Sequence, residues 1–294
     1  MSNTRILCVF AHYDPDNRVQ PYVLYYLRSL RSIVHNFVFV STSGLGQVDV
    51  LSVNEICDTV ILRENIGYDF CSYRLGLESV EFSGFDQIIL CNDSVYGPLM
   101  SLAPVMEDSQ LGVLGFWGIT DSFNPEYHVQ SYFMVFNRSV VLSQEFSEFW
   151  RGVVPLSDKL EVIDEYEVGL SRELIRAGFS AGAWFPATEL TGLGRIFRYP
   201  NHYFRMFCDR WRDPRLYIGL LRSSVERAGV NPSHYEWKRM LSSGRSVFLK
   251  VALIKGHSSV YYDFEQSLDL ISNSTAYPTY LIRTHIDHDR TGLA

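Results

Sequence analysis

Gln87-Ile88-Ile89-Leu90-Cys91-Asn92-Asp93-Ser94 is an apolar run that ends abruptly in three polar residues, one of which carries a carboxylate. A short apolar run of this kind is typical of a buried strand in a parallel sheet. Polar residues that follow such a strand lie at the carboxyl edge of the sheet, where open α/β folds bind ligands. Asn92, Asp93 and Ser94 therefore predict either a nucleotide site with Mg²⁺ or Mn²⁺, or a plain Asx turn.

The segments around this run alternate between strand-like and helix-like patterns. Strands are expected at residues 6–10, 37–40, 60–62, 112–117, 132–136 and 183–185. Helices are expected at residues 17–34, from 69 through 77, through 146–150, at 159–177, 217–228 and 235–241. This alternation predicts an α/β fold with a mostly parallel central sheet flanked by helices. The tail after Gly256 shows little pattern, and we divide the chain into a main domain, residues 1–200, and a C-terminal helical extension, residues 201–294.

The composition is that of a globular protein, with 47% hydrophobic and 20% charged residues among 294 and a formal net charge of -7. This acidic balance disfavours nucleic acid as a partner, since nucleic-acid binding requires a basic face. Arginines between residues 195 and 215 lie among aromatic residues and predict either contact with anionic lipid or phosphate, or a solvated surface. The five cysteines lack zinc or disulfide spacing, and no apolar run approaches the ~20 residues of a membrane span, so we expect a cytoplasmic protein.

Six short motifs resemble those of the rhamnan synthesis protein F family and occur in that family's order. They are residues 63–70 (RENIGYDF), 92–98 (NDSVYGP), 128–133 (HVQSYF), 166–170 (YEVGL), 231–234 (NPSH) and 248–251 (FLKV). The resemblance implies a bacterial glycosyltransferase of surface polysaccharide assembly, acting on O-antigen or capsule. It implies a nucleotide-sugar donor, dTDP-rhamnose or a UDP-sugar, and a lipid-linked glycan acceptor. It also implies a GT-A fold, with the metal held at Asp93.

The resemblance extends to where such a protein works and what it contacts. It implies a peripheral contact with the inner face of the cell membrane, or with other glycosyltransferase domains. One carboxylate binds Mg²⁺ or Mn²⁺ weakly unless substrate phosphates complete the coordination shell. A motif with Asp93 as its single acid therefore leaves metal dependence open.

A second likeness concerns the acidic helix of inverting family-2 glycosyltransferases, which residues 164–172 (DEYEVGLSR) resemble. Inverting transfer needs one carboxylate to deprotonate the acceptor hydroxyl and another group to stabilise the departing diphosphate. The match assigns the base to Glu165, with Asp164 and Glu167 as alternatives. Asp121, which follows a predicted strand, is a rival base. Glu165 and Asp121 also have non-catalytic interpretations. Glu165 would lie on a solvated helix face, and Asp121 would be a turn or capping residue.

Further donor-binding residues are expected at the same edge of the sheet. Asn65 and Asp69 flank Gly67 at a strand-to-helix turn, where they either bind the donor or cap the helix. His12 and Tyr13 follow the first strand, and the Tyr13 ring is expected either to stack on the nucleobase or to pack within a loop.

Four residues are expected to contact the acceptor or the diphosphate. His128 and Gln130 precede an apolar strand, and Trp117 offers either a platform for a sugar or a core side chain. Lys250 lies inside an apolar run and is expected to pair with phosphate or with a buried carboxylate.

Two other classes of function fit parts of the sequence. One is a non-catalytic glycan-binding or scaffold domain, because Ser94 stands where a second aspartate would complete the metal motif. The other is a nucleotidyltransferase or phosphatase, which we rank last because neither a phosphate loop ending in Gly-Lys-Ser/Thr nor a Gly-X-Gly-X-X-Gly motif after the first strand is present.

Overall fold

The computed structural model describes residues 4–123, 125–187, 232–255 and 264–291. The strands are β1 (Ile6–His12), β2 (Asn36–Ser41), β3 (Thr59–Leu62), β4 (Gln87–Asn92), β5 (Val95–Tyr96), β6 (Phe116–Ser122), β7 (His128–Val129), β8 (Phe133–Asn137), β9 (Ala181–Phe185) and β10 (Leu249–Lys250). The helices as far as β9 are α1 (Pro21–Arg31), α2 (Gln47–Asn54), α3 (Tyr68–Glu78), η1 (Phe82–Gly84), α4 (Ala103–Met106), α5 (Ser109–Gly112), α6 (Arg138–Val141), α7 (Gln144–Gly152), α8 (Lys159–Val162), η2 (Ile163–Val168) and α9 (Gly169–Arg176). Those after β9 are α13 (Pro232–Tyr235), α14 (Trp237–Ser242), α15 (Val251–Ile254), α16 (Phe264–Ser274) and α17 (Tyr280–Thr291).

An eight-stranded sheet forms the centre of the molecule, in the order β3-β2-β1-β4-β8-β6-β7, with β9 paired to β6. The pairs β2–β3, β1–β2, β1–β4 and β6–β9 are parallel, whereas β8 runs antiparallel to both β4 and β6. Strands β4 and β6 therefore run in the same direction, and the last residues of β1, β4 and β6 meet along one side, here called the carboxyl edge. The predicted α/β fold with a mostly parallel sheet is confirmed.

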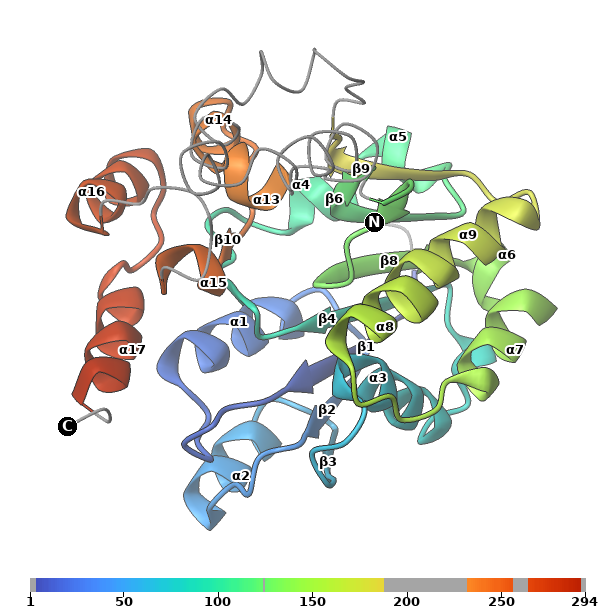
Figure 1. Ribbon diagram of the computed structural model, residues 1–294, viewed down its shortest axis with the longest axis horizontal. Coiled ribbons are helices and arrows are strands. Elements are labelled where there is room, and N and C mark those ends of the chain that lie inside the picture. The colour runs from blue at the N-terminus through green and yellow to red at the C-terminus, as the bar shows by residue number, and fades with distance from the viewer. Residues whose placement is uncertain (1–3, 124, 188–231, 256–263, 292–294) are drawn as a thin grey trace, which may run out of the picture.

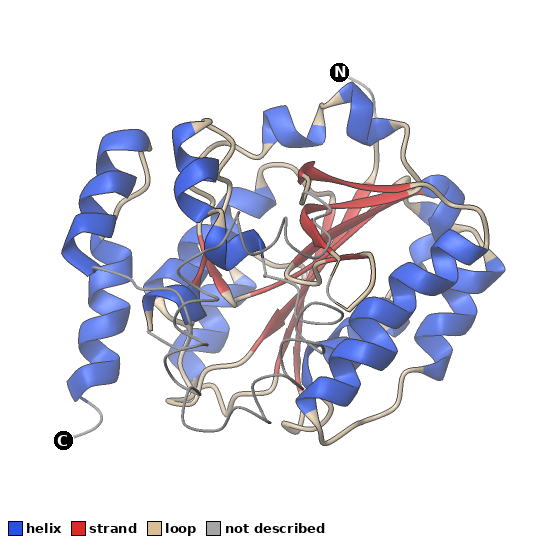
Figure 2. Cartoon of the chain, turned by 45° about the horizontal axis from the view of Figure 1, so that its top comes forward, coloured by secondary structure: helices blue, strands red, loops and turns tan. Residues whose placement is uncertain are grey.

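Helices cover both faces of the sheet (Figures 1 and 2). Successive side chains of a strand point to opposite faces. Accordingly Cys8 and Phe10 of β1 join a core cluster with α1, while Leu7 and Val9 join a second cluster with α3, α7 and α9. Burial on both faces explains why the strands of the sheet read as continuous apolar runs.

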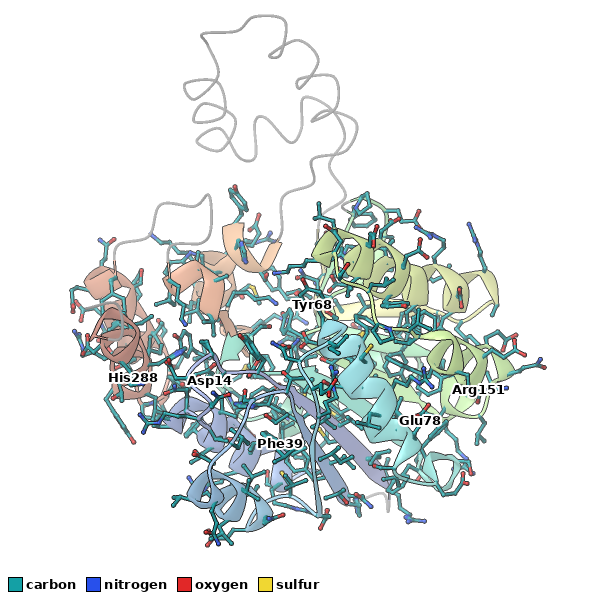
Figure 3. The ribbon with its side chains drawn as sticks, turned by 60° about the horizontal axis from the view of Figure 1, so that its bottom comes forward. Asp14, Phe39, Tyr68, Glu78, Arg151 and His288 are labelled. Atoms are coloured by element: carbon teal, nitrogen blue, oxygen red, sulfur yellow. The ribbon has the colours of Figure 1, made fainter. Side chains whose placement is uncertain are left out.

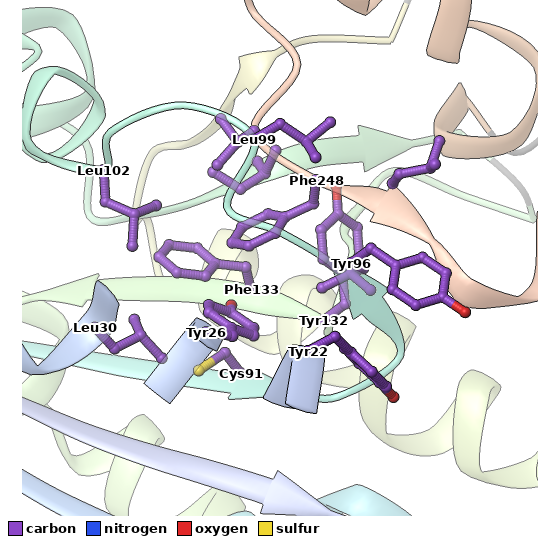
Figure 4. Close-up of a cluster of buried hydrophobic side chains, with 14 of the residues drawn as sticks. Tyr22, Tyr26, Leu30, Cys91, Tyr96, Leu99, Leu102, Tyr132, Phe133 and Phe248 are labelled. Atoms are coloured by element: carbon purple, nitrogen blue, oxygen red, sulfur yellow. The ribbon is translucent and has the colours of Figure 1, made fainter. Parts of the chain in front are cut away.

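The C-terminal segments pack on the α1 face of the sheet. Tyr26 of α1 contacts Phe248 with ring centroids 4.9 Å apart, and Tyr96 and Tyr132 belong to the same cluster (Figure 4). Residues of α14, α16 and α17, such as Ile282, share this core with β1 and α1. The predicted extension thus packs on the sheet, whereas its predicted boundary at residue 200 lies outside the described residues.

Several boundaries differ from those predicted. Helix α2 was not predicted, because Val53 is its only buried residue and it has no periodic apolar face. The strand expected from residue 112 begins at Phe116, because Asp108 caps the short helix α5 with its side chain. The tail expected to lack pattern forms α16 and α17, and the helix expected at 217–228 and the arginine-rich stretch at 195–215 lie outside the described residues.

The long helix expected at 159–177 forms, but it is not uniform. It consists of α8, the π-helical segment η2 and α9, and it ends before Gly178, which has a φ of 94° as expected of a helix stop. No helix in the described ranges is long and apolar enough to span a membrane.

Candidate functional site

Polar side chains from distant parts of the chain gather at the carboxyl edge. His12 ends β1, Asn92 ends β4, and Asp121 lies near the end of β6. The loop after β1 also carries Asp14, labelled in Figure 3, and Asp16, whose carboxylate lies 3.7 Å from Nε2 of His288 in α17. The edge therefore has the position expected for a ligand site in an open α/β sheet.

The Asn92-Asp93-Ser94 motif forms a turn and also binds its neighbours. Asn92 Oδ1 accepts hydrogen bonds from the Ser94 amide at 3.1 Å and the Ser94 hydroxyl at 2.6 Å, so the predicted Asx turn is present. The Asn92 amide group donates to Asp69 Oδ2 at 2.7 Å. Asp93 Oδ2 accepts the Tyr13 N–H at 2.8 Å, which ties the loop after β1 to the end of β4.

Of the two roles predicted for Asp69, donor binding and helix capping, the structure does not show capping. The N-cap of α3 is Gly67, in the left-handed conformation with φ 77°, and no side chain caps this helix end. A Cβ at Gly67 would collide with Cys71 and Pro155, so this position requires glycine. Asp69 instead turns toward the end of β4 and accepts the Asn92 amide, which supports a place at the site.

The carboxylates at the edge are shielded from water. Burial raises the pKa of Asp93 well above its ordinary value, and the charge of Asp69 raises it further. Burial also raises the pKa of Asp69. Carboxylates in such a place favour a nearby cation or a ligand that donates hydrogen bonds.

The described residues do not form a complete metal site. They contain no cluster of three or more His, Cys, Asp or Glu side chains that would hold an ion. His12 Nε2 lies 3.9 Å from Asp93 Oδ2, and burial lowers the pKa of His12 to about 4, which leaves the ring neutral. These two groups would hold Mg²⁺ or Mn²⁺ only with several oxygen ligands from a substrate.

Lys250 brings a positive charge to the same place. Its ammonium lies 3.4 Å from Ser94 Oγ and 4.1 Å from the centre of the Tyr132 ring. Burial lowers the pKa of Lys250 to about 8, while the charges of Glu167 and Asp69 oppose that shift. Both partners predicted for Lys250 fit this position, because carboxylates lie nearby and the turn at the end of β4 is where a phosphate would bind.

The acidic helix presents its carboxylates in different directions. Glu165 is exposed, and the exposed Asp164 lies 3.7 Å from Arg172. Glu167 is half-buried, and its Oε1 accepts the Ser131 N–H at 2.6 Å. Of these three acids, Glu167 is the one tied to the carboxyl edge.

Asp121, the rival base, is buried at the end of β6. Its Oδ1 accepts the Ala187 N–H at 2.5 Å, and the Tyr127 hydroxyl also donates to this carboxylate. Burial raises the pKa of Asp121 above its ordinary value. A carboxyl with a raised pKa is a better proton acceptor at neutral pH than an ordinary one, so the structure keeps Asp121 as a candidate.

The other predicted contacts fall into two groups. His128 and Gln130 lie near the edge, where His128 Nδ1 is 2.9 Å from the Glu126 carbonyl and Gln130 Oε1 accepts the Thr120 hydroxyl at 2.5 Å. Trp117 lies within β6, fully buried against Phe133 at 6.3 Å between ring centroids. Its position matches the core alternative and not that of a sugar platform.

The remaining donor-site predictions fall on loops. Tyr13 is 49% exposed, so its ring is accessible to a ligand, and Asn65 is exposed on the loop before α3. Arg63 holds that loop by donating to the carbonyls of Glu64, Ile66 and Tyr68.

Asp14 follows His12 and Tyr13 at the same edge, and the sequence assigned it no role. It is buried and accepts hydrogen bonds from the Asp16 amide at 3.0 Å and the Gln20 side chain at 2.9 Å. The Asp14-Pro15-Asp16 stretch is a turn signal in the sequence. This signal could have identified Asp14 as the residue that shapes the loop.

Comparisons with known proteins add a family and distant structural relatives. Residues 37–209, more than half of this 294-residue chain, match the model of the family described as rhamnan synthesis protein F. Virulence protein VirA of Vibrio anguillarum is 28% identical over 227 residues, covering 75% of this chain and 70% of VirA.

Two solved structures illustrate the structural likeness. A protein from Desulfovibrio desulfuricans, assigned as a nucleotide-diphospho-sugar transferase, has a TM-score of 0.39 and 11% identity, covering 62% of this chain and 80% of that one. TarS of Staphylococcus aureus has a TM-score of 0.34 and 9% identity, covering 47% of this chain and 48% of that one. At such scores the function has to be argued from the family and from the site.

Proposed function

The chain belongs to the rhamnan synthesis protein F family, and on this basis we propose that it is a glycosyltransferase that moves a sugar from a nucleotide-sugar donor to a growing bacterial surface polysaccharide. The observation that carries the proposal is the arrangement at the carboxyl edge. Asp69, Asp93 and Lys250 converge there on a single turn at the end of β4. This is the position where a sheet of this type binds a nucleotide.

Different residues of the site bind different parts of the nucleotide sugar in this proposal. The exposed ring of Tyr13 stacks on the nucleobase, and the neighbouring Asp93 accepts hydroxyl groups of the ribose or the sugar. The diphosphate lies beside Ser94 and Lys250. Mg²⁺ or Mn²⁺ at Asp93 stays a prediction of the family resemblance alone and has no role in this proposal.

The transfer step requires a base for the acceptor hydroxyl, and we assign it to Glu167 in place of Glu165. Glu167 is on the predicted acidic helix, but its carboxylate is fixed toward the edge by the Ser131 N–H. An inverting transfer requires this carboxylate to act on the face of the sugar opposite the leaving diphosphate, and we propose that outcome at the anomeric carbon. Glu165 and Asp121 are the alternatives that mutagenesis would test.

Membership of the family supports a proposal for the donor sugar and the acceptor. We propose dTDP-rhamnose or a UDP-sugar as donor, and a lipid-linked glycan of an O-antigen or capsule as acceptor. A lipid-linked acceptor requires the enzyme to work at the inner face of the cell membrane, as a peripheral protein or together with other glycosyltransferase domains.

Analysis of reaction products tests this proposal. The protein is incubated with UDP- and dTDP-sugars, with water or added glycans as acceptors, and the nucleotide products are separated by chromatography. Release of UDP or dTDP, abolished in a Glu167→Gln variant, is the expected result. Release of pyrophosphate would indicate nucleotidyl transfer. Failure of folded protein to bind or consume any of these donors would favour the glycan-binding scaffold.

A further inference from the structure

Lys250 is fixed to the Asn92-Asp93-Ser94 turn by the main chain as well as by its side chain. Strand β10 pairs antiparallel with β5, with Leu249 opposite Tyr96 and Lys250 opposite Val95. The Val251 N–H donates to the Ser94 carbonyl at 2.9 Å, next to the contact of the Lys250 ammonium with Ser94 Oγ at 3.4 Å. The cation therefore has a set position beside the turn.

Titratable groups from four elements lie around this ammonium. Asp69 of α3 and Glu167 of η2 attract it, whereas Lys159 of α8 raises the local positive potential. On α13, His234 has a pKa lowered to about 4, by burial and then by the charge of Lys250, so its ring is neutral.

The nearby carboxylates already serve other donors. Asp69 Oδ2 accepts the Asn92 amide at 2.7 Å, and Glu167 Oε1 accepts the Ser131 N–H at 2.6 Å. They act on Lys250 through their charge. A shielded ammonium is costly unless an anion binds it directly, and a diphosphate supplies that anion.

The turn itself is poorly equipped for a metal ion. Asn92 Oδ1 accepts two hydrogen bonds from Ser94, and Asp93 Oδ2 accepts the Tyr13 N–H. The described residues hold no cluster of three acidic, His or Cys side chains to complete a shell. A resident divalent ion does not fit this donor set, whereas a protein cation is already in place.

We propose that Lys250, and not a resident divalent metal ion, neutralises the diphosphate of the donor and of the departing nucleotide. The inference rests on the proposed function. In the step, the bond between the anomeric carbon and the diphosphate oxygen breaks, and its electron pair stays on that oxygen. The acceptor oxygen bonds to the anomeric carbon, and its proton passes to Glu167. Lys250 stays protonated throughout and hydrogen-bonds the developing charge.

Nucleotide binding in the presence and absence of metal tests this inference. UDP and dTDP are titrated calorimetrically into the whole protein in EDTA and again in Mn²⁺. The variants are Lys250→Met, Lys250→Arg and, as a matched control, Lys238→Met, which removes an exposed lysine from α14 in the same part of the chain. Circular dichroism and thermal melting establish that each variant is folded.

The wild-type affinity is expected to be equal in EDTA and in Mn²⁺. Lys250→Met should weaken binding by at least about 30-fold, as the loss of a shielded charge pair does. Lys250→Arg should stay within about tenfold of the wild type, because it keeps the charge, and Lys238→Met should bind as the wild type does.

Four results would overturn the inference. Binding that disappears in EDTA would return the role to a metal and leave the proposed function standing. Unchanged affinity in Lys250→Met would remove Lys250 from the diphosphate, and loss in Lys250→Arg equal to that in Lys250→Met would show that its charge is not what matters. Absence of nucleotide binding by folded wild-type protein under both conditions would overturn the proposed function as well.

Discussion

The two edges of the central sheet use the same residue type in opposite ways. At the amino edge, Asp58 and Asp86 directly precede β3 and β4, and their side chains are 48% and 37% exposed. Each accepts a backbone N–H and faces an arginine, Arg31 at 2.7 Å for Asp58 and Arg138 at 3.2 Å for Asp86.

At the carboxyl edge the aspartates are shielded and lie among neutral donors. Asp69 accepts a hydrogen bond from the Asn92 amide group, and Asp93 accepts one from the Tyr13 backbone N–H. Burial raises the pKa of both carboxylates. A fold optimised only for stability would not gather such carboxylates beside a lysine. The amino edge thus holds structural acids, and the carboxyl edge holds acids placed for a ligand.

The largest expected effect tests whether the acidic helix belongs to the carboxyl edge. Glu167→Gln keeps an acceptor for the Ser131 N–H but removes the base, so transfer should fall by about 10²- to 10⁴-fold while donor affinity changes little. Steady-state kinetics with a calorimetric affinity measurement would show this. Glu161→Gln, which removes an exposed glutamate of α8, is the control expected to keep full activity. A comparable loss in Glu165→Gln, with Glu167→Gln active, would return the base to Glu165.

The next effect compares one aspartate from each edge. Asp93→Asn should lower transfer by about 10- to 100-fold and leave thermal stability equal or higher, because burial disfavours the charge that is removed. Asp86→Asn should leave transfer unchanged and lower the free energy of unfolding by about 1 kcal/mol. Steady-state kinetics and urea unfolding of both variants measure the two quantities, the transfer rate and the free energy of unfolding. The opposite pattern, with activity lost only in Asp86→Asn, would break the distinction between the edges.

A smaller effect concerns pH at the carboxyl edge. Burial lowers the pKa of Lys250 to about 8, so its cationic form predominates below that pH and is lost above it. Affinity for UDP should therefore decline by up to about tenfold per pH unit above the pKa of Lys250. Titrations of the wild type and Lys250→Arg across this range compare the two cations, since arginine stays charged throughout. Parallel curves for both proteins would assign the decline to another group.

The smallest effect is confined to the amino edge. Asp58→Asn weakens the bond to Arg31 but keeps an acceptor for the Phe37 N–H, so the free energy of unfolding should fall by about 0.5 to 1 kcal/mol. Urea unfolding in low and high salt measures it, and the difference should shrink as salt screens the pair. A loss of transfer in this variant would show that the two edges are coupled.

The sequence predicted what depends on local pattern. The apolar run before Asn92 predicted β4 and the polar turn at its end, because a strand buried on both faces has to be apolar throughout. For Asp69 the sequence left donor binding and helix capping open, because its partner Asn92 is 23 residues away in sequence and gives no local signal.

Two further features of the site depend on tertiary structure. The contact of Lys250 with Ser94 spans 156 residues and comes from the pairing of β5 with β10, which has no local signal. The direction of Glu167 depends on the π-helical turn of η2, which shifts the phase of the helix. The resemblance that assigned the base to Glu165, with Asp164 and Glu167 as alternatives, carries no information about this shift of phase.

The measurement that tests the distinction between the edges most directly is calorimetric titration of UDP and dTDP into the wild type, Asp93→Ala and Asp86→Ala. Loss of Asp93 frees the loop that carries Tyr13. We therefore expect the wild type and Asp86→Ala to bind equally, and Asp93→Ala to bind at least about tenfold more weakly. Equal affinity in Asp93→Ala and the wild type, or no binding by any of the folded proteins, would contradict a nucleotide site at the carboxyl edge.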